Sequence, residues 1–399
     1  MTLLALAAAQ VFTPLEIIED GVVLIEDATI RAIGPREAIA VPAGVRLVEL
    51  GDKVLAPGFV DVHIHGASGH DLMEATPEAL EAVAAFVLER GTTSFVPTTL
   101  SAPPAVLLRA LEGLGAAIRS WKTKSASGAP LAEPVGIHLE GPFLSAECRG
   151  VHPREHLQQP SLPLFHDMLA AAHGSLRILT LAPELEGAAE LQAAAMQNGV
   201  RVALGHSNAS YEQATRAINA GAAHAVHVFN AMRPFAHRDP GILGAVLTDD
   251  RVAAEVIADG VHVSEPALRL LLRAKGVARV VLVTDGVSAT GMCPGKYFLG
   301  GMEILVGDDP PTGQLACRNS EGKLAGSVLT QDRAIRNMMR LPGITLCDAV
   351  RMASWNPAQL AGLSDRKGCL RPGADADLVV LEPNGNVVGA MARGKANFV

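Results

Sequence analysis

Eight apolar, strand-like runs recur along the middle of the chain, and this repetition constrains the fold more than any other feature. They cover residues 57–66, 93–101, 134–143, 177–184, 200–207, 224–232, 253–263 and 279–288. Most of the intervals carry helical patterns such as ALEAVAAFVLERG and YEQATRAINAGA, so the runs can be parallel strands joined by right-handed helical crossovers. Eight such units predict an α/β fold of the (β/α)8 TIM-like barrel type. The alternative is an open doubly wound sheet, but no GxGxxG turn follows the first run and no Walker-type loop is present.

The two ends of the chain have a different pattern. The first fifty-odd and the last thirty residues alternate short β-branched runs with Gly, Pro and Asp, which is typical of strands and turns. We therefore expect residues 1–56 and 364–399 to pair into one small β-sandwich domain, and residues 57–363 to form the barrel.

The composition excludes several classes of protein. With 49% hydrophobic and 19% charged residues among 399, the chain is too apolar for disorder and too often interrupted by polar residues for a membrane bundle. A net charge of −8 argues against nucleic acid as a partner. The apolar start contains no basic residue before Arg31, which argues against a signal peptide. Five scattered cysteines without CxxC spacing indicate neither a disulfide framework nor a Cys-ligated zinc site, so a cytoplasmic location is expected.

Residues that can bind a metal fall repeatedly at the carboxyl ends of these runs, where a barrel builds its active site. The candidates are Asp61, His63, His65, Glu140, His206, His227, His262 and Asp285. Imidazoles mixed with carboxylates suit zinc, iron or cobalt. Their recurrence at equivalent strand ends predicts a metal site there.

His63 and His65 are two residues apart, so both lie on one face of the first strand. An HxH pair alone more often marks core or surface histidines, and its weight here comes from the further candidates at other strand ends. Glu140 ends an apolar run, where an unpaired buried carboxylate would be costly. A bound metal would remove that cost.

Three other candidates have ordinary structural alternatives. His206 could cap the helix that follows it. His227 could be a core histidine, although His224 suits that role better. Asp285 precedes a glycine, and Asp-Gly is a common turn pair. Beside a water activated by a metal, however, Asp285 is a natural general base and then acid.

The motifs resemble the amidohydrolase superfamily and, within it, the family of N-acetylglucosamine-6-phosphate deacetylases. The match extends from LAPGFVDVHIHG to GCLRPGADADLVVL, and HLEGPF, HVFNAM and LAGS are its most specific parts. The resemblance implies a hydrolase that converts N-acetyl-D-glucosamine 6-phosphate into D-glucosamine 6-phosphate and acetate, in amino-sugar catabolism or cell-wall recycling.

The resemblance also implies a divalent metal, zinc or iron, with Asp285 as catalytic acid/base. The metal ligands it implies are Glu140, His206, His227, His63, His65 and Asp285. Some members lack the HxH pair and bind one ion, whereas this chain keeps it, so a second ion bridged by Glu140 is expected. The fourth run has no lysine, which counts against dihydroorotase-like and hydantoinase-like enzymes.

Substrate contacts follow from the same resemblance. His152 in RGVHP would polarise the acetyl carbonyl group and bind substrate. Residues expected to hold the 6-phosphate and the sugar hydroxyls are Asn230, Ala231, Arg238 and His262. Arg238 would reach the neighbouring subunit's substrate, which implies a homodimer. Cys148 is interpreted as an incidental small residue.

Other functions remain open at this point. The substrate could be N-acetylgalactosamine 6-phosphate or, for another amidohydrolase, a nucleobase. The barrel could also be a non-catalytic sugar-phosphate-binding protein, but the retention of Asp285 and of every expected ligand weighs against that. The epimer, the metal and the number of ions are not fixed by the sequence.

Overall fold

The computed structural model describes residues 2–124 and 128–398. Met1 and Val399, the outer limits of the two ranges expected for the small domain, lie outside the described residues. The boundaries 56/57 and 363/364 between that domain and the barrel stay a prediction.

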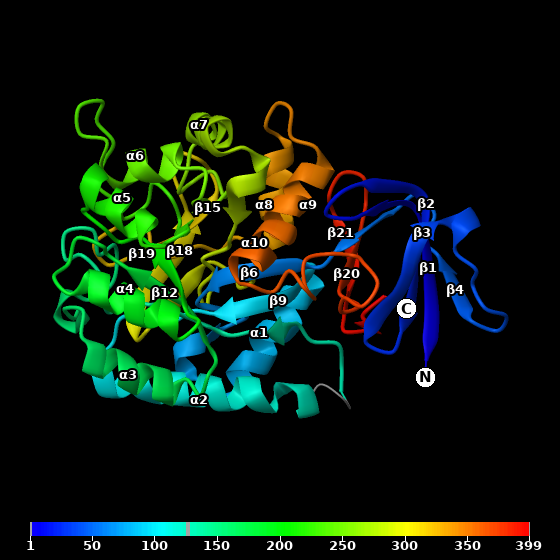
Figure 1. Cartoon of the computed structure of the whole chain (residues 1–399), viewed down its shortest axis with the longest axis horizontal. Coiled ribbons are helices and arrows are strands. Elements are labelled where there is room, and N and C mark those ends of the chain that lie inside the picture. The colour runs from blue at the N-terminus through cyan, green and yellow to red at the C-terminus, as the bar shows by residue number, and fades with distance from the viewer. Residues whose placement is uncertain (1, 125–127, 399) are drawn as a thin grey trace.

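A closed parallel barrel forms the larger part of the molecule (Figure 1). Its strands are β6 (Phe59–Ile64), β9 (Thr92–Pro97), β11 (Ile137–Glu140), β12 (Leu176–Leu181), β13 (Arg201–Leu204), β14 (His224–Ala225), β15 (Ala253–Val256) and β16 (Val280–Leu282). Each overlaps one of the eight apolar runs. A parallel bridge from Thr98 to His138 joins β9 to β11, and another from Ile64 to Gly286 closes the ring between β6 and the segment after β16. The predicted barrel is confirmed.

Helices cover the outside of this barrel, as the alternating pattern predicts. They are α1 (Pro77–Glu89), α2 (Pro104–Lys124), α3 (Leu162–Ala171), α4 (Ala188–Gln197), α5 (Tyr211–Asn219), α6 (Gly241–Thr248), α7 (Glu265–Lys275), α8 (Gln331–Met339), α9 (Leu346–Ala353) and α10 (Trp355–Leu360). Their starts are encoded locally. Thr76 accepts a hydrogen bond from the Ala79 amide ahead of α1, and Ser210 with Gln213 forms a capping box at α5.

Shorter elements complete the barrel region. β7 (Gly66–Ala67) pairs with β8 (His70–Asp71), and β10 (Glu133–Pro134) pairs with β9. Single 3-10 turns of this region are η2 (Leu72–Glu74), η3 (Arg154–His156) and η4 (Val277–Arg279), whereas η1 (Arg36–Ala38) belongs to the small β domain. No described helix has the length and apolar character needed to cross a membrane.

Both ends of the chain meet in one small β domain, also as predicted. Its strands are β1 (Leu3–Phe12), β2 (Ile17–Glu26), β3 (Thr29–Pro35), β4 (Arg46–Glu49), β5 (Val54–Pro57), β20 (Leu378–Leu381), β21 (Val387–Ala392) and β22 (Lys395–Ala396). The blue and red strands lie together at the right of Figure 1, because β20 pairs antiparallel with β5. Apolar side chains pack on both faces of β1 and β2.

A buried ionic network ties this domain to the barrel. The Nζ atom of Lys367 lies 2.6 Å from Glu133 Oε2, 2.9 Å from Asp375 Oδ2 and 2.7 Å from Asp377 Oδ2. Burial would raise the pKa of Glu133, but Lys367 and Arg366 lower it to about 2. The charges are therefore kept in the interior by mutual pairing.

An antiparallel sheet inserted after the eighth barrel strand was not predicted. It contains β17 (Gly295–Leu299), β18 (Met302–Asp308) and β19 (Leu315–Asn319). One face buries Leu299, Ile304 and Val306 against Leu100 and Val151. Because the other face is exposed, the apolar content is low and no continuous apolar run marks these strands. The insertion contributes to the wall of the cavity described next.

Candidate active site

A cavity of about 250 Å³ opens at the carboxyl ends of the barrel strands. Its lining includes residues predicted from the sequence: His65, Glu140, His206, His227, Asn230, Ala231, His262 and Asp285. These residues lie far apart in the chain and converge because parallel strands end on the same side of the barrel.

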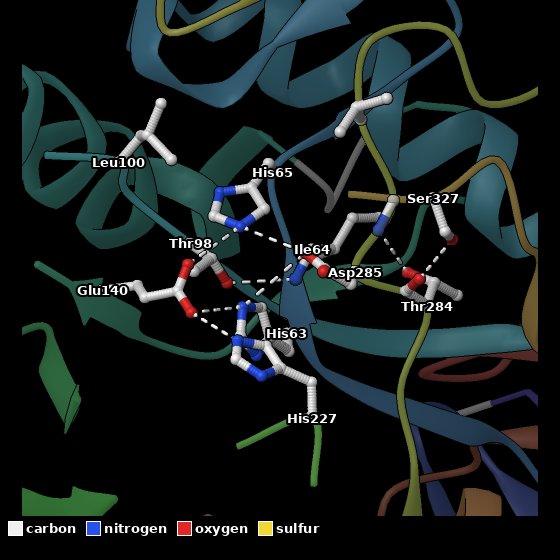
Figure 2. Close-up of polar contacts among 12 residues, drawn as sticks. His63, Ile64, His65, Thr98, Leu100, Glu140, His227, Thr284, Asp285 and Ser327 are labelled. Atoms are coloured by element: carbon white, nitrogen blue, oxygen red, sulfur yellow. Dashed lines mark hydrogen bonds and ion pairs between the residues drawn. The ribbon is translucent and has the colours of Figure 1, made fainter. Parts of the chain in front are cut away.

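Glu140 is the centre of the cluster (Figure 2). Its Oε1 atom lies 3.1 Å from His206 Nε2, 3.0 Å from His227 Nε2 and 3.3 Å from His63 Nε2. Its Oε2 atom lies 3.2 Å from His65 Nε2. The two carboxylate oxygens thus face two different groups of imidazoles, as a bridging ligand would.

Asp285 lies on the HxH side of this carboxylate. Its Oδ1 atom is 3.2 Å from His65 Nε2 and 3.8 Å from His63 Nε2. Among the described residues that line the cavity, Asp285 and Glu140 are the carboxylates.

Hydrogen bonds behind the cluster set the orientation of two imidazoles. His63 Nδ1 donates to Glu255 Oε2 at 3.0 Å, and the other oxygen of Glu255 accepts from His224 Nε2 at 2.6 Å. His206 Nδ1 donates to the carbonyl oxygen of Cys148 at 3.1 Å. In each case Nδ1 donates to an acceptor behind the cluster, which leaves Nε2 on the Glu140 side as the atom that can bind a metal, the arrangement usual for metal-binding histidines.

His152 has the opposite tautomer. The backbone N–H of Ser101 donates to His152 Nδ1 at 3.2 Å, so the ring proton is on Nε2, which lies 3.4 Å from Glu140 Oε2. Burial lowers the pKa of His152 to about 4. This ring is therefore neutral and can donate a hydrogen bond into the site.

The electrostatics of the cluster favour bound positive charge. Burial would raise the pKa of Glu140, but His63 and His206 hold it well below its usual value. Burial would lower the pKa of His63, but Glu140 and Glu255 raise it well above its usual value. Ionised carboxylates thus attract cationic partners among side chains that are themselves buried.

The donor set fits a divalent metal. His206 Nε2 and His227 Nε2 lie 3.1 Å apart and both lie within 3.1 Å of Glu140 Oε1, so all three atoms can reach one ion. His63 Nε2 is buried and has no hydrogen-bond partner in the described part of the chain. Three groups have ligand atoms close enough to share one ion: His63–Glu140–His227, His63–His65–Asp285 and Glu140–His152–His206. Nitrogen ligands mixed with carboxylate oxygens suit zinc and iron.

Several cluster residues occupy unusual backbone conformations. His206, His227 and Asp285 have φ values of 46°, 26° and 48°, and Ala231 has 51°. Left-handed conformations are uncommon for residues other than glycine and tend to gather at functional sites. Here they occur just beyond the ends of β13, β14 and β16, where the chain turns each side chain toward the cavity.

Three of the five predicted substrate residues line the cavity, whereas His152 lies behind the lining in contact with Glu140, and Arg238 lies away from it. Asn230, Ala231 and His262 line it, and Asp259 Oδ2 accepts from His262 Nδ1 at 2.7 Å. Arg238 is exposed on the loop before α6 and does not line the cavity of its own chain.

Sequence reasoning missed four supporting residues. Glu255 orients His63, and Ser101 fixes the tautomer of His152, while Leu299 and Lys323 from the inserted sheet region line the cavity. Glu255 carried a usable signal, because it is a carboxylate within an apolar run, as Glu140 is. Cys148 acts here through its backbone carbonyl, and burial raises the pKa of its thiol to about 11.

Comparison with known proteins defines the class. The model of the amidohydrolase family matches residues 54–396. The chain therefore belongs to the amidohydrolase family.

Closer relatives define the group within it. The chain is 35% identical over 392 residues to the N-acetylglucosamine-6-phosphate deacetylase of Bacillus subtilis (strain 168), covering 98% of this chain and 96% of that protein. It is 37% identical to the N-acetylgalactosamine-6-phosphate deacetylase of Escherichia coli O157:H7, covering 92% and 91%. A mutant N-acetyl-D-glucosamine-6-phosphate deacetylase from Mycobacterium smegmatis, solved in complex with N-acetyl-D-glucosamine-6-phosphate, superposes with a TM-score of 0.90 at 34% identity and covers 99% of each chain. Within the amidohydrolases, this chain is a member of the N-acetylglucosamine-6-phosphate deacetylase group.

Proposed function

We propose that the protein hydrolyses the amide of N-acetyl-D-glucosamine 6-phosphate to D-glucosamine 6-phosphate and acetate. One observation carries the proposal: Asp285 and the Nε2–H of neutral His152 both contact the Glu140 cluster beside the cavity. Amide hydrolysis needs an activated water, a proton carrier and an oxyanion donor, and this site has groups of each kind. The Mycobacterium smegmatis complex supports the choice of substrate.

The metal would be zinc or iron. We assign the principal ion to Glu140, His206 and His227, and a second ion to His63 and His65 with Glu140 as bridge and Asp285 as a further ligand. A divalent ion bound there supplies Lewis acidity and lowers the pKa of a coordinated water. The ring N–H contacts with Glu255 and the Cys148 carbonyl keep the imidazole lone pairs of His63 and His206 directed at that position.

Asp285 is the proposed proton carrier. Burial would raise its pKa, but His65 and His63 lower it, so its carboxylate is ionised and can act as a base. It takes a proton from the water that attacks the acetyl carbon. It then delivers this proton to the sugar nitrogen as the C–N bond breaks.

His152 is the proposed oxyanion donor. Its Nε2–H is directed into the cluster because Nδ1 accepts from the Ser101 amide. A preformed donor of this kind stabilises the negative charge that develops on the carbonyl oxygen.

We assign the phosphate to Asn230, Ala231, His262 and, from the neighbouring subunit, Arg238. No arginine is among the described residues that line the cavity, so a strong bidentate phosphate ligand would have to come from elsewhere. The exposed position of Arg238 supports a homodimer in which this residue reaches across. The five cysteines are free thiols, which supports a cytoplasmic location.

A panel of substrates tests this function. We expect kcat/KM to be highest for N-acetyl-D-glucosamine 6-phosphate, lower for the galactosamine epimer, and much lower for unphosphorylated N-acetylglucosamine, because binding energy from the remote phosphate positions the amide. The galactosamine epimer is the second candidate, because the Escherichia coli relative bears that name. If kcat/KM is higher for the galactosamine epimer, then N-acetylgalactosamine 6-phosphate is the substrate and the proposal is wrong.

A further inference from the structure

A second cavity, larger than the first, lies at the opposite end of the barrel. Its volume is about 370 Å³, and its lining includes residues at the starts of β13, β14 and β15 and just before β16. The active-site cavity lies at the carboxyl ends of the same strands. The proposed deacetylation does not use this second cavity.

Positive charge surrounds it. Arg201, Arg251 and Arg279 line it, and no aspartate or glutamate is among its described lining residues. Arg251 is paired with Asp249. The guanidinium groups of Arg201 and Arg279 have no hydrogen-bond or ion-pair partner among the described residues, so both are available to a ligand in a chain with a net charge of −8. Guanidinium groups bind phosphate through paired, charge-assisted hydrogen bonds.

Two lining side chains also have buried acceptors without partners. Asn356 donates both protons of Nδ2, to the carbonyl oxygens of Val277 and Val280 at 2.7 Å each, and its Oδ1 atom has no partner. His224 donates from Nε2 to Glu255, and its Nδ1 atom has no partner. The two residues are only 4% and 3% exposed. Unsatisfied buried acceptors are uncommon and often mark a place where a ligand or water donates.

A short polar chain connects the two ends of the barrel. His224 contacts Glu255, and Glu255 contacts His63 Nδ1. His63 in turn lies beside Glu140. A ligand that contacts His224 would therefore act at one end of a chain whose other end positions a residue of the active site.

We propose that this second cavity binds a small polyhydroxylated phosphate monoester and that its occupancy changes turnover at the active site. The phosphate would contact Arg201 and Arg279, while ligand hydroxyl groups donate to Asn356 Oδ1 and His224 Nδ1 after side-chain shifts that expose these two buried atoms. The volume falls within the range of small-molecule sites, roughly 300–1,000 Å³. This inference goes beyond the proposed deacetylase activity: the binding residues are different, and only the coupling passes through Glu255 and His63 of the active site.

Glucose 6-phosphate, inorganic phosphate and glucose are suitable probes. Glucose 6-phosphate can also enter the active site, so the quantity to compare is the number of molecules bound per chain, measured by equilibrium dialysis. We expect the unmodified protein to bind one molecule more than an Arg201→Glu/Arg279→Glu variant, in which affinity at this cavity falls by about tenfold or more. The matched control is Arg46→Glu/Arg109→Glu, which changes the charge equally at two exposed arginines outside the cavity lining.

If the unmodified protein and the Arg201/Arg279 variant bind the same number of glucose 6-phosphate molecules per chain, the proposed second site is wrong. Equally tight binding of inorganic phosphate there would overturn the requirement for hydroxyl groups. These counts do not require catalysis, so they separate failure of this site from failure of the proposed function.

Turnover provides the second readout. At saturating substrate, competition at the active site is suppressed, so we expect glucose 6-phosphate to change kcat at least about twofold in the unmodified protein and in the control, but not in the Arg201/Arg279 variant. An unchanged kcat with the second molecule bound would overturn the coupling through Glu255.

Discussion

Replacement of Asp285 by asparagine removes the proposed proton carrier while changing the shape of the side chain very little. The backbone of Asp285 holds the local structure independently of the carboxylate, because its N–H donates to the His63 carbonyl at 2.9 Å and its carbonyl accepts from Ser327 at 2.7 Å. We therefore expect Asp285→Asn to fold normally.

The expected fall in kcat is large because no other residue of the site can replace Asp285 as the base. Glu140 is surrounded by five histidines, and neutral His152 has its Nδ1 lone pair engaged by Ser101. A positioned proton-transfer group contributes roughly 100-fold or more, equal to about 2.7 kcal/mol of barrier. We expect kcat to fall by at least that factor and KM to change little.

The assay is acetate release at saturating substrate, with metal content measured on the same sample. Asp332→Asn is the matched control, because Asp332 is also a buried aspartate but lies on α8 and does not line the cavity. Retention of more than about a tenth of kcat by Asp285→Asn with metal bound would refute its role and turn attention to His152.

Four further predictions concern metal content, the subunit interface and stability. The double variant His63→Asn/His65→Gln should bind less metal per chain while keeping the principal ion, as measured by elemental analysis. Arg238→Ala should raise KM strongly for the phosphorylated sugar and little for the unphosphorylated one, measured by steady-state kinetics. Lys367→Ala should lower the free energy of unfolding by about 3–5 kcal/mol in denaturant titrations, because it leaves buried Asp377 without its ion-pair partner and takes one cation from Glu133 and Asp375, which keep Arg366. Since the pKa of Glu133 is lowered from 4.5 to about 2, its contribution to stability is present above about pH 4.5 and is lost as the pH falls toward 2, so Glu133→Gln should flatten the acid limb of the stability profile.

The first three of these predictions each have a control experiment or a result that would contradict them. The binuclear assignment is wrong if unmodified protein supplied with excess zinc or iron never exceeds one ion per chain. Mixing Arg238→Ala chains with Asp285→Asn chains should restore part of the activity, because one site of a mixed dimer combines both intact residues. A fully active monomer would contradict that arrangement. Lys296→Ala, which breaks an exposed pair with Glu303, should change stability by no more than about 1 kcal/mol, and an equal loss in both lysine variants would contradict the buried network.

The barrel could be predicted from the sequence because its strands are buried on both faces and appear as continuous apolar runs. The inserted sheet could not, since Tyr297, Ile304 and their neighbours alternate with exposed residues over short spans. The place of this sheet in the sequence, after the eighth barrel strand, also did not indicate that it would form part of the active-site wall.

The site was predictable to the extent that it depends on strand ends. His65, Glu140 and Asp285 lie at or just beyond the ends of three different strands and were expected together because parallel strands end on one side. The tautomer of His152 was not predictable, since it depends on the Ser101 amide, which only the folded loops bring into contact. Arg238 does not line the cavity of its own chain, and its proposed contact with the phosphate would need a second chain.

The central claim is that this site cleaves an acetyl amide, and the products test it most directly. Purified protein loaded with zinc or iron should convert N-acetyl-D-glucosamine 6-phosphate into acetate and D-glucosamine 6-phosphate in equal amounts, followed by NMR over complete turnover of the substrate. Unchanged substrate after many hours with metal bound, or release of ammonia without acetate, would contradict the account.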